Sequence, residues 1–422
     1  MIQHILTIIW NQRKSNVWIF LELLLVVFIF VSIADSLLVD TYTYTRPLGF
    51  DTNNVYVVNV GKHTETTDSI QRTQTGENFI ELTERLRQCP EVEAAGIGKY
   101  SCPYSGSNLY SVLIREQDTL TITQDNMMSN IYHTLVSDLE YFRVFRIQTK
   151  DGKPLADELQ HSPGTIAISA DMEKNFFGTE SGVGKRVKYS KNDLTGETIA
   201  AVTTPIRSNE FENGEECYYY LIRTDQDWID RMQNLDISHF QCFIRMKDGF
   251  DPKDMDAFLQ RQGERLEVGN LYISGIQPVN DFRDAALKSR FDNQAKKIAL
   301  VAFMMVNIFF GIVGTFWLRT QSRRAEIGLR AAVGASKSRL RGQLYGEGLL
   351  LLLLTLPIAI IYMANMLYLD MPDTDRLAYT GWRFFTTFGA TYMILGLMIY
   401  LGIRIPAGKI TRMNPADTLH YE

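Results

Sequence analysis

Residues 298–318 read IALVAFMMVNIFFGIVGTFWL, an apolar run that continues without a charged residue until Arg319. A helix needs about 20 such residues to cross roughly 30 Å of hydrocarbon. Three further stretches meet this requirement, at 17–38, 348–367 and 384–403. The sequence therefore predicts four transmembrane helices, although the mean hydropathy of the 422 residues is only -0.10.

The first apolar stretch contains two acidic residues, Glu22 and Asp35, toward its two ends. There a side chain can reach the membrane interface or pair with another helix, which is the more common role. An acid inside a span can also mark an ion or proton path, so both interpretations stay open. The stretch is longer than the apolar region of a signal peptide, about 7–15 residues, so we expect the helix to be retained.

Basic residues set the orientation, because short cytoplasmic loops carry an excess of Lys and Arg. Arg13 and Lys14 precede the first stretch, and the loop after the third is acidic. The loop between the second and third stretches is strongly basic, with Arg319, Arg323, Arg324, Arg330, Lys337, Arg339 and Arg341. We predict a multi-pass protein of the cell inner membrane with both termini cytoplasmic and a large periplasmic segment. The formal net charge of -5 gives no reason to expect nucleic acid as a partner.

The segment between the first two spans alternates strand-like and helix-like patterns, which predicts an α+β domain of two lobes inserted between helices 1 and 2. Expected strands are 55–60, 110–115, 165–169, 198–202, 218–223 and 240–246. Expected helices are 78–87, 170–177 and 252–266, and 62–76 has the composition of a loop. The predicted domains are 1–38 (N-terminal segment and helix 1), 39–296 (periplasmic), 297–405 (helices 2–4) and 406–422 (cytoplasmic tail).

All four cysteines fall in the predicted periplasmic domain: Cys89, Cys102, Cys217 and Cys242. An even number in an oxidising compartment allows two disulfides, and the pairing of nearest neighbours would join Cys89 to Cys102 and Cys217 to Cys242. Four buried free thiols fit the sequence equally well. A metal site is less favoured, because no two cysteines have C-x-x-C spacing.

Nothing in the sequence supports an enzyme, a cofactor or a metal site. Residues 178–186 come nearest to a Walker A loop, but the spacing is wrong and Arg186 replaces the hydroxyl residue, so we expect a glycine-rich turn. The six histidines are scattered and no G-x-S-x-G motif is present. Gly342 and Gly346 form a small-xxx-small pair, which predicts close helix packing, with an oligomer contact as the other interpretation.

The basic loop carries the most specific motif, RRAEIGLRAAVGASK at 323–337. Glu326 and Arg330 are spaced as an i,i+4 ion pair on a short helix, and Gly334 is suited to end that helix before Ala335 and Ser336 begin the next. One interpretation is a basic helix that lies on membrane lipid. The other is a docking surface for a protein, in which small residues permit close approach.

The motif Glu-Ile-Gly-Leu-Arg-x-Ala-x-Gly-Ala after a transmembrane helix resembles the cytoplasmic loop of MacB/FtsX-like ABC transporter permeases. Three other segments resemble patterns of the same family, so the resemblance covers most of the chain. They are Leu135-Val136-Ser137 with Tyr141-Phe142, Phe176-Phe177-Gly178 with Gly184-Lys185, and Pro406-Ala407 with Pro415 and Leu419.

The resemblance implies a permease that forms a homodimer or heterodimer with a second permease copy and works with a separate ABC ATPase subunit. Its coupling residues would be Glu326, Ile327, Gly328, Leu329, Arg330, Ala331, Gly334 and Ala335. The function implied is export of a periplasmic substrate, with a periplasmic adaptor or outer-membrane protein as a further partner. The alternative is a mechanotransmission or signalling subunit that controls a periplasmic partner such as a cell-wall hydrolase. A receptor without an ATPase is a third hypothesis, disfavoured because the chain shows no output domain.

Overall fold

The computed structural model describes residues 7, 10, 13–63, 69–106, 108–118, 128–190, 192–193, 195–322, 329–330, 333 and 335–410. The chain divides into two compact units. We call Met1–Tyr44 with Ser289–Glu422 the helical unit, and Thr45–Lys288 the sheet unit.

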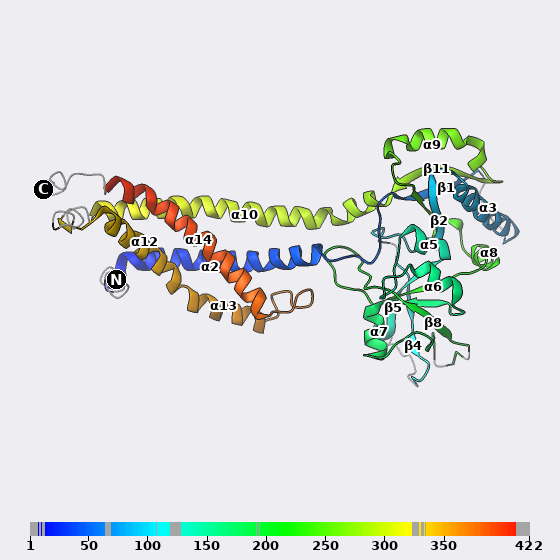
Figure 1. The fold of residues 1–422 in the computed structure, drawn as a ribbon, viewed down its shortest axis with the longest axis horizontal. Coiled ribbons are helices and arrows are strands. Elements are labelled where there is room, and N and C mark those ends of the chain that lie inside the picture. Colours follow the sequence, from blue (N-terminus) through cyan, green and yellow to red (C-terminus); the bar gives the residue numbers. More distant parts are fainter. Residues whose placement is uncertain are drawn as a thin grey trace. The chain divides into compact units, whose positions relative to one another are not determined.

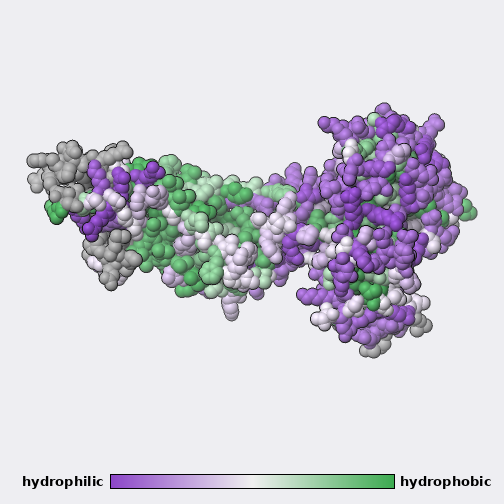
Figure 2. All heavy atoms as spheres, viewed as in Figure 1, coloured by the Kyte–Doolittle hydropathy of each residue, from purple (hydrophilic) through white to green (hydrophobic). Residues whose placement is uncertain are grey.

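Among the described residues, the helical unit contains α2 (Arg13–Tyr44), most of α10 (Val279–Ser322), α12 (Lys337–Leu354), α13 (Leu356–Tyr368) and α14 (Gly381–Ile410). Within this described part of the chain, four helical segments are long and apolar enough to cross a membrane: Asn16–Tyr44, Val279–Ser322, Lys337–Tyr368 and Gly381–Ile405. Hydrophobic residues dominate the surface of this unit and hydrophilic residues that of the sheet unit (Figure 2). The four predicted apolar helices are confirmed, and each extends beyond the apolar run that predicted it.

The third of these segments is interrupted at Thr355, between α12 and α13. Pro357 lies in the first turn of α13 and has no N–H to continue the hydrogen-bond ladder. The Thr355 side chain donates to the carbonyl oxygen of Leu352 and lies 2.9 Å from the Tyr392 hydroxyl on α14. The break is therefore stabilised from a neighbouring helix.

Close helix packing occurs at Gly348, two residues after the predicted pair. A Cβ atom at Gly348 would lie 2.6 Å from Ile403 and 2.7 Å from Ile399, whereas one at Gly342 would meet no described atom within 4 Å. Gly348 thus lets α12 approach α14. Among the described residues, none packs closely against Gly342, so close packing of the pair with Gly346 stays a prediction.

The sheet unit is built on eleven strands. They are β1 (Val55–Lys62), β2 (Val92–Lys99), β3 (Tyr110–Val112), β4 (Ile114–Arg115), β5 (Ile131–Ser137), β6 (Ile166–Ile168), β7 (Arg186–Lys188), β8 (Glu197–Val202), β9 (Cys217–Leu221), β10 (Phe240–Met246) and β11 (Leu271–Pro278). Their order is β11-β1-β10-β2-β5-β9-β6-β8-β7-β4, with β3 on β5. Figure 1 labels β11, β1, β2, β5, β8 and β4 of this sheet. The pairs β5–β9 and β6–β8 are parallel and the remaining pairs antiparallel, which makes the sheet mixed.

Helices cover both faces of this sheet, because alternate residues of a strand point to opposite sides. Tyr56 and Val58 join one core with α3 (Ser69–Arg87), α8 (Asp225–Asn234) and α9 (Met255–Gln262). Val55 and Val57 join the other with α5 (Leu139–Val144) and α6 (Leu155–His161). A third core lies under α7 (Ala170–Phe177).

Several predicted elements are confirmed, including 55–60, 170–177 and 240–246, and the expected helix 252–266 is a run of short helical pieces. The predicted loop 62–76 is wrong in part, since α3 begins at Ser69. These polar residues are helical because the helix packs through Thr75, which is 3% exposed and donates to the Gln71 carbonyl. The turn at 178–186 is confirmed, with Gly178 and Gly184 both at positive φ.

The four cysteines are buried free thiols, so the disulfide alternative is not adopted. Their places in the fold explain this: Cys89 follows α3, Cys102 lies after β2, Cys217 opens β9 and Cys242 lies within β10. Burial raises the pKa of Cys102 and of Cys242 to about 12. Such thiols are neutral and unreactive at ordinary pH.

Candidate functional site

The predicted coupling residues fall mostly outside the described part of the chain. Glu326, Ile327, Gly328, Ala331 and Gly334 belong to this group. The described members are Leu329, Arg330 and Ala335. Leu329 is 56% exposed, and the Ala335 N–H donates to the Arg330 carbonyl at 2.9 Å. The next helix begins at Lys337, with Ser336 as its N-cap, as predicted.

Arg330 connects this segment to α12 through side chains. Its guanidinium donates to Gln343 Oε1 at 2.6 Å, and Gln343 Nε2 donates to Glu347 Oε1 at 3.3 Å. Glu347 is fully buried within the helical unit. We name Arg330, Gln343 and Glu347 the loop network. Sequence reasoning missed the last two, and the available signal was an acid one residue before the apolar run that starts at Gly348.

A second polar site ties together α2, α10, α14 and the loop before α14. We name its members the charge cluster: Asp35, Asp40, Lys297, Asp373, Arg376 and Arg383. Arg383 forms a two-point ion pair with Asp35, at 2.8 Å from Nε to Oδ1 and 2.6 Å to Oδ2. The exposed fractions of the two side chains are 0% and 6%. Such a fork-to-fork pair fixes orientation as well as charge.

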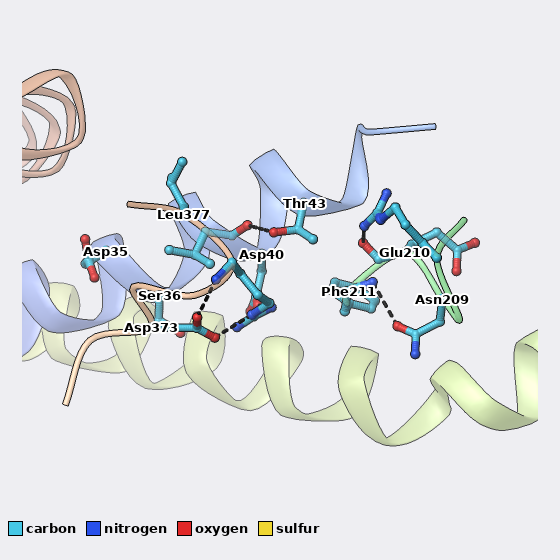
Figure 3. Close-up of polar contacts among 12 residues, drawn as sticks. Asp35, Ser36, Asp40, Thr43, Asn209, Glu210, Phe211, Asp373 and Leu377 are labelled. Carbon is cyan, nitrogen blue, oxygen red and sulfur yellow. Dashed lines mark hydrogen bonds and ion pairs between the residues drawn. The ribbon is translucent and has the colours of Figure 1, made fainter. Parts of the chain in front are cut away.

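The rest of the cluster surrounds Asp40. Arg376 lies 2.8 Å from Asp40 and 2.5 Å from Asp373, and the two carboxylates converge on it from α2 and from the loop (Figure 3). Lys297 of α10 lies 3.6 Å from Asp40 and donates to Ser36 at 2.6 Å. Burial raises the pKa of Asp373, but hydrogen bonds from Arg376 outweigh it and hold the pKa below its usual value. Three carboxylates face three bases, so the cluster is neutral as a whole.

The two acids of the first span differ in their surroundings. Asp35 is paired with Arg383, which supports the helix-pairing interpretation. Glu22 lies against α10, where a Cβ atom at Gly311 would be 2.7 Å from its Oε1. The partner Arg383 was not foreseen, because sequence places it 348 residues from Asp35. Among the described residues, no group of three His, Cys, Asp or Glu side chains could hold a metal ion.

Comparison with known proteins defines the class. Residues 298–415 match the family described as FtsX-like permease C-terminal. MacB 1, a macrolide export ATP-binding/permease protein of Yersinia pestis bv. Antiqua, is 24% identical over 298 residues, covering 68% of this chain and 43% of that protein. MacB 2 of Aeromonas hydrophila subsp. hydrophila is 25% identical over 297 residues, covering 67% and 42%. The chain thus spans less than half the length of these curated relatives.

Two solved structures resemble part of the chain. The periplasmic region of MacB from Actinobacillus actinomycetemcomitans matches with a TM-score of 0.34 and 12% identity, covering 56% of this chain and 94% of that one. The extracellular domain of the noncanonic ABC-type transporter YknZ from Gram-positive bacteria matches with a TM-score of 0.30 and 9% identity, covering 53% and 100%.

The carboxyl-terminal part of the chain thus carries an FtsX-like permease domain, and the described residues include four helices apolar enough to cross a membrane. The loop motif, this domain and the similarity to MacB proteins at 24–25% identity all point to the same family of permeases.

Proposed function

We propose that the chain is the permease subunit of an ABC transporter whose separate ATPase docks on the segment from about Ala325 to Val333. ATP-driven movement of that segment would then be transmitted to the sheet unit, for export of a periplasmic substrate. The loop network is the observation that carries this proposal. It joins Arg330, within the docking segment, to the buried Glu347 of α12, so a displacement of the segment acts directly on a membrane helix.

The proposed topology has both termini in the cytoplasm and the sheet unit, within residues 39–296, in the periplasm. The basic loop, the acidic loop 370–375 and the four apolar helices support it. The described ends of the chain, at α2 and α14, lie at one end of the helical unit (Figure 1). We further propose a dimer of two permease copies with an ATPase on each, in the inner membrane.

The docking claim is tested by co-purification of the ATPase with the double variant Glu326→Lys, Ala331→Trp. We expect recovery to fall at least about 30-fold, since breaking a paired charge at an interface costs about 2–5 kcal/mol. Glu264→Lys, an exposed charge reversal in the sheet unit, is the matched control and should change nothing. Equal recovery with unchanged ATPase activity would contradict docking and favour the helix lying on lipid.

A second variant separates docking from transmission. Gln343→Leu removes the link between Arg330 and Glu347 without altering the docking segment. We expect the ATPase to bind normally while its stimulation by the permease falls. Stimulation of ATP hydrolysis by a transported substrate would favour export over the mechanotransmission alternative.

A further inference from the structure

A cavity of about 220 Å³ lies within the sheet unit, on one face of its central strands. β5 and β9 are parallel, with His133 opposite Cys217 and Leu135 opposite Tyr219. Because side chains alternate along a strand, these four share a face. The segments 100–104 and 206–209, with Gly106 and Asn108, complete the cavity wall.

Five aromatic rings line this cavity. The rings come from Phe50, Tyr100, Tyr104, Tyr141 and Tyr219. A cavity of about 150 Å³ lined by apolar side chains holds one benzene molecule. The larger volume here accommodates one aromatic ring with a small substituent.

The segment over the cavity is held in a strained conformation. Tyr100 has φ 51° and Tyr104 has φ 63°, in the left-handed region that bulky residues avoid. The Tyr100 hydroxyl is 2.5 Å from His239 Nδ1, and Tyr104 donates to Glu210 at 3.2 Å. Strain of this kind persists where the surroundings enforce it, and it is concentrated at ligand sites.

The supports of this segment are themselves fixed. Arg283 donates to Glu210 at 2.5 Å, and the Phe211 N–H donates to Asn209 at 2.9 Å (Figure 3). The Tyr141 hydroxyl donates to the Ser101 carbonyl at 2.7 Å. Tyr141 can come this close because Gly96 of β2 has no side chain: a Cβ atom there would be 2.4 Å from the Tyr141 nitrogen. The cavity is therefore preformed.

Polar atoms without partners lie among the lining residues. The Ser101 hydroxyl and both ring nitrogens of His133 are buried and make no hydrogen bond. The Glu215 carboxylate is 3.2 Å from His133 Nδ1, within ion-pair distance but without hydrogen-bond geometry. Unsatisfied buried polar groups are costly, and a ligand that pairs with them recovers that cost.

We propose that this cavity binds a single-ring phenol. The ring would lie among the tyrosines, and the hydroxyl would face His133 and Ser101. A phenolic hydroxyl can donate to an imidazole nitrogen and accept from a serine hydroxyl, which matches the His133 and Ser101 side chains that make no hydrogen bond. The proposal is independent of the docking of an ATPase, because every residue in it belongs to the sheet unit.

The test is a titration of the full chain in lipid nanodiscs with phenol, and with toluene as the isostere without a hydroxyl. Saturation-transfer NMR reports binding, and empty nanodiscs give the blank. We expect saturable phenol binding, tighter than toluene binding by about 2- to 10-fold, the size of one net hydrogen bond. Ser101→Ala should reduce this preference and leave toluene binding unchanged.

Leu135→Trp should fill the cavity and abolish binding of both compounds. Ile70→Trp, at a position 80% exposed on α3, is the matched control and should bind like the wild type. Ser101→Ala removes a hydroxyl that has no partner, so it should fold even where Leu135→Trp does not. Signal no greater than that of empty nanodiscs would overturn the proposal, as would equal affinities for phenol and toluene in the wild type.

Discussion

Arg383 of the helical unit and Arg207, one of the buried arginines of the sheet unit, are accommodated in different ways. Arg383 of the helical unit is fully buried and forms a two-point ion pair with Asp35. Arg207 of the sheet unit is 1% exposed and donates to the carbonyl oxygens of Arg46, Glu210 and Glu212. Burial and the neighbouring Arg46 lower the pKa of Arg207.

The difference follows from the surroundings of each unit. A charge inside a membrane has no water nearby, so it needs an opposite charge close by. In the sheet unit, carbonyl dipoles hold the buried guanidinium of Arg207. Arg383 thus links α2 to α14 through an ion pair, whereas Arg207 links two loops through hydrogen bonds to their carbonyl oxygens.

The largest effect on stability is expected from breaking the ion pair between Asp35 and Arg383. Asp35→Leu leaves the Arg383 charge buried without its carboxylate, which should lower the free energy of unfolding by about 3–5 kcal/mol. Thermal unfolding of the full chain in nanodiscs, followed by tryptophan fluorescence, measures this loss.

The double variant Asp35→Leu, Arg383→Leu is the control for that prediction. It removes both charges, so it should recover much of the lost stability. Recovery should be incomplete, because Arg383 also donates to the carbonyl oxygens of Asp373 and Leu377. If the single variant is as stable as the double variant, the buried charge of Arg383 does not need the Asp35 carboxylate.

The charge cluster also shows which features could not be predicted from the sequence. The four apolar helices were predictable because length and hydropathy are local properties, as were β1, α7 and β10 through their periodicity. The partners of Asp35 were not, since Arg383 meets it only after the helices pack. Likewise β2, whose sequence VEAAGIGK is small and glycine-rich, was missed because its strand conformation is imposed by β10 and β5.

The hydrogen bonds of Arg207 should contribute less to stability than the Asp35–Arg383 ion pair, but they should depend on the planar shape of the guanidinium. Arg207→Lys keeps the charge, yet an ammonium cannot match the planar fork that reaches three carbonyl oxygens. We expect the free energy of unfolding of the sheet unit to fall by about 1–3 kcal/mol. Arg261→Lys, at an exposed ion pair with Glu91, is the matched control and should be neutral. If Arg207→Lys leaves the free energy of unfolding unchanged, a positive charge alone is sufficient for stability at this position.

The buried carboxyl group of Asp138 should make the stability of the sheet unit depend on pH. Burial raises the pKa of Asp138 to about 7, although Arg87 at 2.9 Å and the Tyr141 N–H oppose the shift. The unfolded value is about 3.9, so the folded state favours the protonated form. This contribution to stability is complete below about pH 4 and is lost as the pH rises through about 7.

Asp138→Asn should remove that dependence and keep the helix cap, since Asn also accepts from the Tyr141 N–H. We expect the stability difference between the two proteins to change by about 1.4 kcal/mol per pH unit between pH 4 and 7. Denaturant unfolding of the full chain at several pH values measures it. Parallel curves would mean that the Arg87 pair keeps Asp138 charged throughout.

The smallest effect is expected at an exposed ion pair, in contrast to the buried pair of Asp35 and Arg383. Lys185 lies 2.6 Å from Glu180 across a glycine-rich turn, and the exposed fractions of the two side chains are 36% and 75%. The hydrogen bond from Lys185 lowers the pKa of Glu180, but water solvates both groups when the pair is absent. Glu180→Gln should therefore leave the unfolding temperature unchanged at physiological salt. Low salt sharpens the test, because screening is weakest there. A clear loss of stability at both salt concentrations would show that the turn depends on this pair, and that distance rather than burial decides what an ion pair contributes in this protein.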